Sequence, residues 1–334
     1  MTHWTGIKPK VNVFSWNKNI GMRFIKKNSG VCTCGGNAPG INYGLKVLQE
    51  TVQQPLLYFQ DGFKGLNEDN YKKELIIESE YGSAIGLSRE KLNVEKAIET
   101  LLRRGITNLY VFGGNGSVCA SYLLHEMIEE YKLPICVNVI PTTIDNDIEN
   151  VQNTIGFKTS VKICSDIIDI AKEEAKSYKQ IALVELMGRE SGFIAVHASY
   201  ESNNVDCLLI PEKNVSISVL VDTVREIYYK QGYVVCVIAE GCRHDLRVLS
   251  AYFDNVKIFE PGYMCRNGQT IEKEYIKNMV RRCVYISEYG WGGFIMSELN
   301  EKPVIVPLHR CALAIKNVPS DYYLMPYVPM IYES

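Results

Sequence analysis

Residues 92–117, LNVEKAIETLLRRGITNLYVFGGNGS, form a helix, strand and loop pattern that predicts the fold class. Five apolar side chains share one helical face, those of residues 94, 97, 98, 101 and 102. Gly105 follows where a helix usually ends. The next apolar run, 108–112, is too short for a helix and indicates a buried strand that ends at Gly113-Gly114. The sequence therefore predicts a glycine loop at the carboxyl end of a strand.

The same alternation of elements extends over most of the chain. Short apolar runs predict further buried strands at Leu56–Phe59, Ile135–Ile140, Ile181–Leu186 and Tyr233–Ala239. Helical patterns separate them, at about 41–53, 118–131, 160–176 and 216–230. Strands that alternate with helices are typical of parallel sheets. We therefore predict an α/β fold of two doubly wound domains with largely parallel sheets.

The composition is that of a globular protein. The 334 residues are 46% hydrophobic and 22% charged, and 36 Lys and Arg nearly balance 38 Asp and Glu. This balance excludes a segment disordered by charge, and it excludes a strongly basic nucleic-acid binder. Chains of this length usually form about two domains. We therefore expect no nucleic-acid partner.

Cysteine usage and the absence of long apolar segments predict the compartment. The 11 cysteines are spread along the chain without a CxxC pair, which favours free thiols in a reducing environment. No stretch approaches the ~20 apolar residues of a membrane helix. Residues 1–28 lack the apolar core of a signal peptide. We expect a soluble cytoplasmic protein with no membrane partner, and the basic, acid-free residues 1–28 leave a transit sequence as the alternative.

Two glycine-rich segments are candidates for holding phosphate through backbone N–H groups. Cys34–Gly40 (CGGNAPG) connects a short strand to a helix, and Gly113–Ser117 (GGNGS) follows the strand at 108–112. A helix N-terminus behind such a loop favours anions. Neither segment has the spacing of GxxxxGK[ST] or GxGxxG. A tight turn explains the first equally well, and Ser117 as a helix N-cap explains the second.

Other predicted strand ends carry charged side chains. Pro141–Asp147 (PTTIDND) places two carboxylates two residues apart, which suits a proton acceptor and a metal partner in phosphoryl transfer. Glu185–Gly192 (ELMGRESG) offers an arginine, whose planar fork matches phosphate. Glu240-Gly241 and Pro261–Arg266 are similar segments. At each place an ordinary polar turn is the alternative.

In this order and spacing, these segments resemble the phosphofructokinase family, whose members phosphorylate fructose 6-phosphate at its 1-hydroxyl in glycolysis. The resemblance runs from about residue 29 to residue 307, and PTTIDNDI at 141–148 with VELMGR at 184–189 is its most specific part. It implies a phosphofructokinase-like fold, ATP and Mg²⁺ as cofactors, and fructose 6-phosphate as substrate. It also implies a homo-oligomer, a dimer or tetramer, with sites shared between subunits.

The resemblance implies a role for each matching residue. Asp145 is the expected base for the 1-hydroxyl, Thr143 helps to hold the transferring phosphoryl group, and Arg189 completes the catalytic set with Asp147. The expected metal partners are Asn115 and Asp147. The residues on the nucleotide side are Gly35, Arg89, Gly114, Asn115, Gly116 and Ser117. Those on the sugar-phosphate side are Thr143, Asp145, Met187, Gly188, Arg189, Glu240, Lys257, Tyr263 and Arg266.

Several positions depart from the family's pattern. Asn115 replaces an aspartate that helps to hold the metal, so we expect weaker magnesium binding. Gln180 replaces an arginine that crosses the subunit interface, for which Lys179 is a candidate substitute. Lys257 replaces an arginine that reaches in from a neighbouring subunit, and Tyr263 replaces a histidine of bacterial ATP enzymes. A catalytically weak regulatory or binding homologue is therefore an alternative function.

The resemblance also predicts the phosphoryl donor and the domain boundaries. Gly116 leaves room for the α-phosphate of ATP where pyrophosphate enzymes have an aspartate, whereas Thr142 is neither the glycine of ATP enzymes nor the lysine of pyrophosphate enzymes. ATP is the expected donor, with a pyrophosphate-dependent enzyme as the alternative. After an extension at 1–28, we expect a donor domain at 29–156 completed by about 265–303. We expect a sugar-phosphate domain at 157–264 completed by about 304–334.

Overall fold

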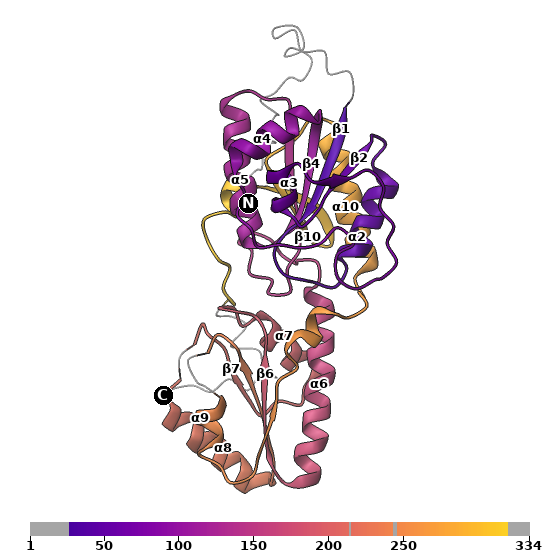
Figure 1. Ribbon diagram of the computed structural model, residues 1–334. Coiled ribbons are helices and arrows are strands. Elements are labelled where there is room, and N and C mark those ends of the chain that lie inside the picture. The colour runs from indigo at the N-terminus through magenta and orange to yellow at the C-terminus, as the bar shows by residue number, and fades with distance from the viewer. Residues whose placement is uncertain (1–26, 214, 243–245, 320–334) are drawn as a thin grey trace. The chain divides into compact units, whose positions relative to one another are not determined.

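The computed structural model describes residues 27–213, 215–242 and 246–319 (Figure 1). These residues form two compact units. The first contains residues from 27–143, 148–155 and 272–315, and the second contains residues from 144–147, 156–271 and 316–319. Each unit has a mostly parallel sheet with helices on both faces. The predicted α/β class is confirmed.

The two structural units divide the C-terminal part of the chain at other residues than the predicted segments 265–303 and 304–334 do. Residues 265–271 lie with the second unit, because the 3₁₀ helix η1 (Gly262–Arg266) packs on a helix of that unit. Residues 304–315 lie with the first unit, because they include a strand of its sheet and a short 3₁₀ helix, η2 (Leu308–Arg310).

The sheet of the first unit contains seven strands among the described residues, in the order β11-β10-β5-β4-β1-β2-β3. Their bounds are β1 Asn28–Thr33, β2 Leu56–Phe59, β3 Tyr71–Lys72, β4 Ile106–Gly113, β5 Cys136–Pro141, β10 Phe294–Leu299 and β11 Lys302–Pro307. The five inner strands are parallel, and the two edge strands, β3 and β11, are antiparallel to their neighbours. The carboxyl ends of β1, β4 and β5 therefore lie at one edge of this sheet.

Helices cover both faces of this sheet. They are α2 (Ile41–Thr51), α3 (Phe63–Glu68), α4 (Val94–Arg103), α5 (Asn115–Glu130) and α10 (Lys273–Glu288). α2 and α10 pack together on one face, whereas α3, α4 and α5 cover the other (Figure 1). The side chain of Asn93 caps α4 by accepting a 3.0 Å hydrogen bond from the backbone N–H of Lys96. α5 begins three residues before the predicted start at 118, because Gly114 rather than Ser117 occupies the N-cap position.

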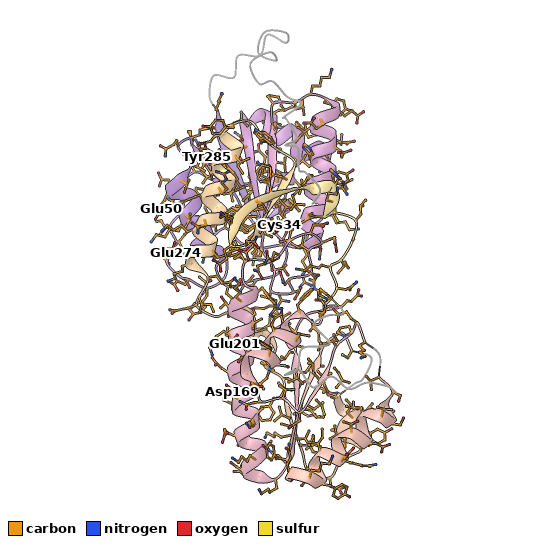
Figure 2. The ribbon with its side chains drawn as sticks, turned by 180° about the vertical axis from the view of Figure 1, so that it is seen from behind. Cys34, Glu50, Asp169, Glu201, Glu274 and Tyr285 are labelled. Atoms are coloured by element: carbon orange, nitrogen blue, oxygen red, sulfur yellow. The ribbon has the colours of Figure 1, made fainter. Side chains whose placement is uncertain are left out.

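The sheet of the second unit contains four parallel strands among the described residues, in the order β7-β8-β6-β9. Their bounds are β6 Ile181–Leu186, β7 Cys207–Leu209, β8 Val234–Ala239 and β9 Val256–Phe259. The helices are α6 (Phe157–Tyr178), α7 (Phe193–Ser202), α8 (Ile217–Gln231) and α9 (Leu246–Ser250). α8 and α9 pack on one face of the sheet and α6 and α7 on the other. Asp169 of α6 accepts hydrogen bonds from Ser202 and Asn204 at the end of α7 (Figure 2).

Most of the cysteines are buried in the interior of the two units. All 11 cysteines lie among the described residues as free thiols, and most are buried, such as Cys236 in β8. Burial raises the pKa of the Cys136 thiol to about 12, so this group stays protonated at neutral pH. Among the residues that the structure describes, no helix has the length and apolar character needed to cross a membrane.

Two helical glycines in the first unit provide a matched test of packing. A Cβ at Gly44 in α2 would lie 2.6 Å from Cε1 of Phe112, whereas a Cβ at Gly116 in α5 would meet no heavy atom within 4 Å. We predict that Gly44→Ala lowers the free energy of unfolding by about 1–3 kcal/mol through overpacking. Gly116→Ala should leave it unchanged or raise it by up to about 1 kcal/mol. Urea unfolding followed by circular dichroism measures both, and equal effects would contradict this packing.

Candidate functional site

The first glycine loop begins where β1 ends. The backbone N–H of Cys34 donates a 2.8 Å hydrogen bond to the carbonyl of Phe112, and that of Gly35 donates a 2.9 Å bond to the carbonyl of Ser88. Gly35 has a φ of +92°, and a Cβ added there would meet no heavy atom within 4 Å. The loop therefore combines a backbone conformation that favours glycine with open space above it.

The second glycine loop connects β4 to α5. A Cβ at Gly113 would lie 2.2 Å from Oγ of Ser117, and a Cβ at Gly114 would lie 3.3 Å from Cβ of Thr143. The position of a Cβ at Gly116 is open. Ser117 is buried, and Asn115 and Gly116 lie in the first turn of α5. The loop thus presents the positive end of a 16-residue helix with little side chain around it.

The end of β5 lies beside this loop. The backbone N–H of Thr142 donates a 2.9 Å hydrogen bond to the carbonyl of Gly113. The hydroxyl of Thr142 is turned inward, where it donates a 3.0 Å bond to the carbonyl of Ile140. The carbonyl of Thr143 accepts a 2.6 Å bond from the hydroxyl of Thr154, and its side chain is half-buried. Thr143, two residues after β5, therefore places its side chain beside Gly114 of the second glycine loop.

Arg89 follows Ser88, which is hydrogen-bonded to the first glycine loop. Ser88 forms an isolated parallel bridge with Cys34, which brings residue 88 beside the end of β1. Arg89 itself is exposed, and it forms no ion pair with any residue that the structure describes. The structure thus gathers Gly35, Arg89, Thr143 and the residues 114–117 in the first unit.

The second unit holds a buried carboxylate between two guanidinium groups. Asp145 is 2% exposed. Its Oδ2 lies 3.6 Å from Nε of Arg189, and its Oδ1 lies 3.9 Å from Nη2 of Arg266. The hydroxyl of Ser191 donates a 3.4 Å hydrogen bond to the Asp145 carbonyl. This arrangement can accept a proton on the carboxylate while the guanidinium groups bind an anion.

The loop that carries Arg189 is held by Glu240. Oε1 of Glu240 accepts hydrogen bonds from the backbone N–H of Gly188, at 3.1 Å, and of Arg189, at 2.6 Å. Gly188 has a φ of +152° and Arg189 a φ of +54°, which is uncommon for a residue other than glycine. A Cβ at Gly241 would lie 2.0 Å from the carbonyl oxygen of Arg189. Glu240 therefore stabilises the shape of this loop, and Met187 is half-buried at its start.

Arg266 reaches Asp145 from η1. The carbonyl of Cys265 accepts a 2.6 Å hydrogen bond from the hydroxyl of Ser160 in α6, which fixes η1 on that helix. Arg266 is 7% exposed, whereas Tyr263 is 69% exposed. The Cζ of Arg266 lies 6.0 Å from the centroid of the Tyr263 ring, at the outer limit of a cation–π contact. The four predicted residues Asp145, Arg189, Glu240 and Arg266 are thus connected, with Tyr263 beside them.

Lys257 lies at the other end of the second sheet. It pairs with Ala182 at the start of β6, whereas Gly188 and Arg189 follow the end of that strand. Gln180, the residue that departs from the family's arginine, is buried at the same end as Lys257. Within one chain, the structure therefore does not bring Lys257 to Asp145.

Asp147 is the carboxylate that the sequence associates with a metal. It is 7% exposed, and its carbonyl accepts a 2.9 Å hydrogen bond from the backbone N–H of Lys316. In the described part of the chain, no group of three His, Cys, Asp or Glu side chains is arranged to hold a metal ion alone. Mg²⁺ is usually bound by one or two carboxylates together with substrate phosphates and waters, and a single buried carboxylate fits that mode.

Sequence reasoning missed Glu212 in the second unit. Its two carboxylate oxygens accept hydrogen bonds from the backbone N–H of Gly192, at 3.0 and 3.1 Å, and Oε1 also accepts a 3.1 Å bond from Val318. Glu212 thereby anchors the end of the loop that carries Arg189. The available signal was a carboxylate just after an apolar run, in Leu208-Leu209-Ile210-Pro211-Glu212.

Comparisons with known proteins agree with this fold. The sequence matches the phosphofructokinase family over residues 28–300. The structure of a pyrophosphate-dependent phosphofructokinase from Marinobacter aquaeolei superposes with a TM-score of 0.81 at 19% identity, covering 92% of this chain and 89% of that one. A Pichia pastoris phosphofructokinase superposes with a TM-score of 0.76 at 22% identity, covering 86% and 35%. The fold is therefore the α/β fold of the phosphofructokinases.

Relatives in sequence carry the same family name. ATP-dependent 6-phosphofructokinase 1 of Arabidopsis thaliana is 36% identical over 233 residues, which cover 65% of this chain and 49% of the relative. The ATP-dependent 6-phosphofructokinase of Entamoeba histolytica is 26% identical over 338 residues, covering 87% and 78%. This chain thus spans about half the length of the Arabidopsis relative. The chain belongs to the phosphofructokinase family.

The role of Glu240 can be tested by amide exchange. We predict that Glu240→Ala accelerates hydrogen exchange at the amides of Gly188 and Arg189 by about 10- to 100-fold. The reason is that a hydrogen bond to a charged acceptor contributes about 1.5–3 kcal/mol. Glu240→Gln retains an acceptor oxygen and should have a smaller effect. Mass spectrometry of peptides that contain residues 188–189 measures this, with Glu190→Ala as the control. Unchanged exchange in Glu240→Ala would contradict the assigned role.

Proposed function

We propose that this chain is a 6-phosphofructokinase that transfers the γ-phosphate of ATP to the 1-hydroxyl of fructose 6-phosphate. The product is fructose 1,6-bisphosphate, in glycolysis. The observation that carries the proposal is the buried carboxylate of Asp145, which is flanked by Arg189 and Arg266 and follows Thr143 by two residues. The names of the Arabidopsis and Entamoeba relatives, both ATP-dependent 6-phosphofructokinases, support it.

The second unit holds the acceptor in this proposal. Asp145 accepts the proton of the 1-hydroxyl as that oxygen attacks the phosphoryl group. Arg189 and Arg266 bind the anionic sugar phosphate through charge-assisted hydrogen bonds. Gly188 lets the backbone come close, and Met187 and Tyr263 contact the sugar. Glu240 acts by holding the loop of Arg189 in place, as its two backbone hydrogen bonds support.

The first unit holds the donor. Backbone N–H groups of Gly114 and Gly116 bind its phosphate oxygens, and Gly35, whose own N–H is bonded to Ser88, leaves open space for the donor beside them. Ser117, at the start of α5, and the exposed Arg89 lie on the same nucleotide side. Thr143 orients the transferring phosphoryl group. Positioning and electrostatic stabilisation supply most of the acceleration in such a reaction.

Magnesium would be held by Asp147, with the amide oxygen of Asn115 as a weaker second partner. Bound together with the nucleotide, the ion neutralises phosphate charge. Asn115 contributes an oxygen without a charge, so the ion depends mainly on Asp147 and on the phosphates themselves. We therefore assign ATP and Mg²⁺ as the cofactors of this chain.

ATP is the donor that the structure favours over pyrophosphate. The open position at Gly116 leaves room for an α-phosphate, whereas Thr142 favours neither donor. A pyrophosphate-dependent enzyme is the second candidate, and the fold of the Marinobacter enzyme is compatible with it. A weakly active binding homologue is the third, because Asn115 and Gln180 both depart from the family's pattern.

We also propose a cytoplasmic homo-oligomer, a dimer or tetramer, as the working form. The position of Lys257 supports shared sites, because it lies at the end of β6 opposite to Arg189 and is exposed. Lys257 would then serve the sugar phosphate of a neighbouring subunit. The first structural unit corresponds in this proposal to the donor domain and the second to the sugar-phosphate domain.

A donor assay tests the proposed reaction. Purified protein with Mg²⁺ and fructose 6-phosphate should form the bisphosphate with ATP, and turnover with pyrophosphate alone would overturn the choice of donor. Binding of fructose 6-phosphate without turnover on either donor would favour the regulatory homologue.

Asp145→Asn should lower kcat by about 10²- to 10⁴-fold, the usual contribution of a general base. Asp166→Asn, on the exposed surface of α6, is the matched control, and an unchanged kcat in Asp145→Asn would remove the assigned base.

The metal assignment predicts a gain of affinity. Asn115→Asp should lower the Mg²⁺ concentration that gives half-maximal activity severalfold, since Mg²⁺ prefers a carboxylate to an amide oxygen. Asn203→Asp adds the same charge at an exposed position after α7 and should leave the magnesium dependence unchanged. A titration of activity with Mg²⁺ at fixed ATP compares the variants. If Asn115→Asp does not shift the titration, the ion is held elsewhere.

A further inference from the structure

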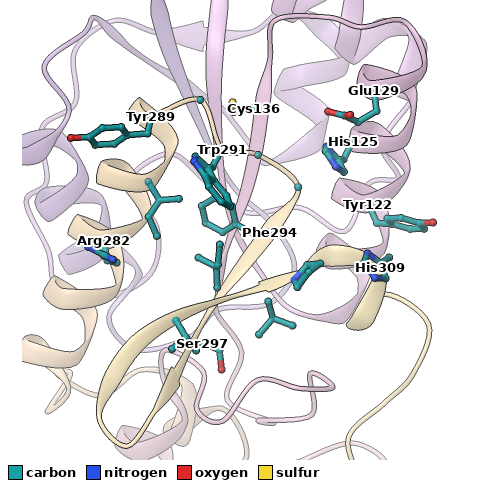
Figure 3. A pocket seen from close by; sticks show the side chains of 18 of the residues that line it. Tyr122, His125, Glu129, Cys136, Arg282, Tyr289, Trp291, Phe294, Ser297 and His309 are labelled. Carbon is teal, nitrogen blue, oxygen red and sulfur yellow. The ribbon is translucent and has the colours of Figure 1, made fainter. Parts of the chain in front are cut away.

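The first unit contains a large cavity that the proposed reaction does not use. Its volume is about 1340 Å³, and it is lined by α5, the start of β5, α10, the loop 290–293 and the hairpin of β10 and β11 (Figure 3). Cys136, at the amino end of β5, lies in its wall. The glycine loops and Thr143 follow the carboxyl ends of β1, β4 and β5. The cavity is therefore separate from the donor loops.

Two polar side chains project from α5 into this cavity. Figure 3 shows His125 and Glu129 on the side of α5 that faces Trp291. Within the described residues, the carboxylate of Glu129 has no ion pair and no hydrogen bond, and Nδ1 of His125 is buried without a hydrogen-bond partner. Burial lowers the pKa of His125, so its imidazole is neutral at pH 7 and does not neutralise Glu129. An uncompensated negative charge thus faces the cavity.

Trp291 lies opposite these groups and lines the cavity. Nδ2 of Asn138 donates a 3.2 Å hydrogen bond to the carbonyl of Trp291, and the backbone N–H of Gly293 donates a 2.8 Å bond to the carbonyl of Val137. A Cβ at Gly293 would lie 2.1 Å from Nε2 of His125, so the loop passes directly against α5. The backbone of the loop that carries Trp291 is therefore held in place on β5 and against α5.

The side chain of Arg282 lies on a second aromatic group of the same cavity, the ring of Tyr285. The Cζ of Arg282 is 5.3 Å from the centroid of the Tyr285 ring, and the rings of Tyr285 and Tyr289 are 4.9 Å apart. Both tyrosines are at least half exposed, so their rings are accessible to a ligand. The ring of Tyr285 thus forms a favourable cation–π contact with Arg282 in this cavity.

The charge of the lining selects the sign of a ligand. Four carboxylates line the cavity, those of Glu126, Glu129, Glu130 and Glu298, and Arg282 is the one arginine or lysine in the lining. A phosphorylated ligand would be repelled by this excess of negative charge. A cation with a flat apolar body would gain both a charge pair and a stacking surface.

We propose that this cavity is a binding site for a small organic cation of the aromatic amidinium or ammonium class. The cationic group pairs with the carboxylate of Glu129, and the flat body of the ligand lies on Trp291. This site is independent of the proposed kinase reaction. The proposal rests on the geometry of the cavity, the unpaired carboxylate and the position of Trp291 opposite it.

Benzamidine and benzamide provide a direct test, because they share a shape and differ in charge. Trp291 is the one tryptophan among the described residues, and its fluorescence reports binding in the full-length protein. We expect benzamidine to change the fluorescence saturably and benzamide to bind at least tenfold more weakly. Glu129→Gln should weaken benzamidine binding at least tenfold, whereas Glu95→Gln, on the exposed surface of α4, should leave it unchanged.

Three results would overturn the proposal. One is equal affinity for benzamidine and benzamide, which would show that charge plays no part. Another is undiminished binding in Glu129→Gln, which would place the cation elsewhere. The third is a fluorescence change that persists in Trp291→Phe, which would mean that a tryptophan outside the cavity reports the signal. The comparison of the two ligands in the unaltered protein keeps the test valid if a variant fails to fold.

Discussion

The close approach of three backbone segments at the end of β4 is the constraint on which the first unit depends. Gly113 has no room for a side chain, because Ser117 at the start of α5 occupies the space that a Cβ would need. The same glycine accepts a hydrogen bond from Thr142 at the end of β5. The end of one strand, the end of its neighbour and the start of a helix therefore meet with only the small side chain of Ser117 in the space beside Gly113. Backbone N–H groups remain available to an anion as a result.

The residue that we assign as the base is placed by different contacts. Asp145 follows Thr143 by two residues, yet it belongs by its contacts to the second unit, where Arg189, Arg266 and Ser191 surround it. Arg189 depends in turn on Glu240, and the loop end at Gly192 depends on Glu212. The carboxylate thus lies between side chains from two segments, the loop that carries Arg189 and η1, each anchored by its own hydrogen bonds.

Much of this arrangement could be predicted from local sequence, and the remainder required tertiary contacts. β2 and β6 have the bounds that their apolar runs predict, because buried parallel strands are short and continuously apolar. α7 was not predicted, because its residues are buried on most sides and show no amphipathic period. β11 contains Pro303 and Pro307, which argue against a strand except at an edge, and an edge is where it lies.

In the candidate site, too, local sequence predicted some features, and others depend on tertiary contacts. The motifs identified Asp145 and Arg189 because their spacing is specific, but motif spacing carries no information on which atom a side chain contacts. Glu240 was expected at the substrate, and no local pattern indicated that its Oε1 also accepts two backbone N–H groups. Glu212 was missed because its partners lie 20 and 106 residues away in the chain. Such contacts follow from the packing of loops and not from any local pattern.

The interleaving of the two units has a consequence for how the chain is made on the ribosome. β5 needs β10 as its neighbour, yet residues 156–271, most of the second unit, are synthesised between these two strands. A nascent chain therefore carries β5 with an unpaired edge while most of another α/β unit is synthesised after it. Such an edge can pair with a wrong strand before the right one emerges, and molecular chaperones act on intermediates of this kind.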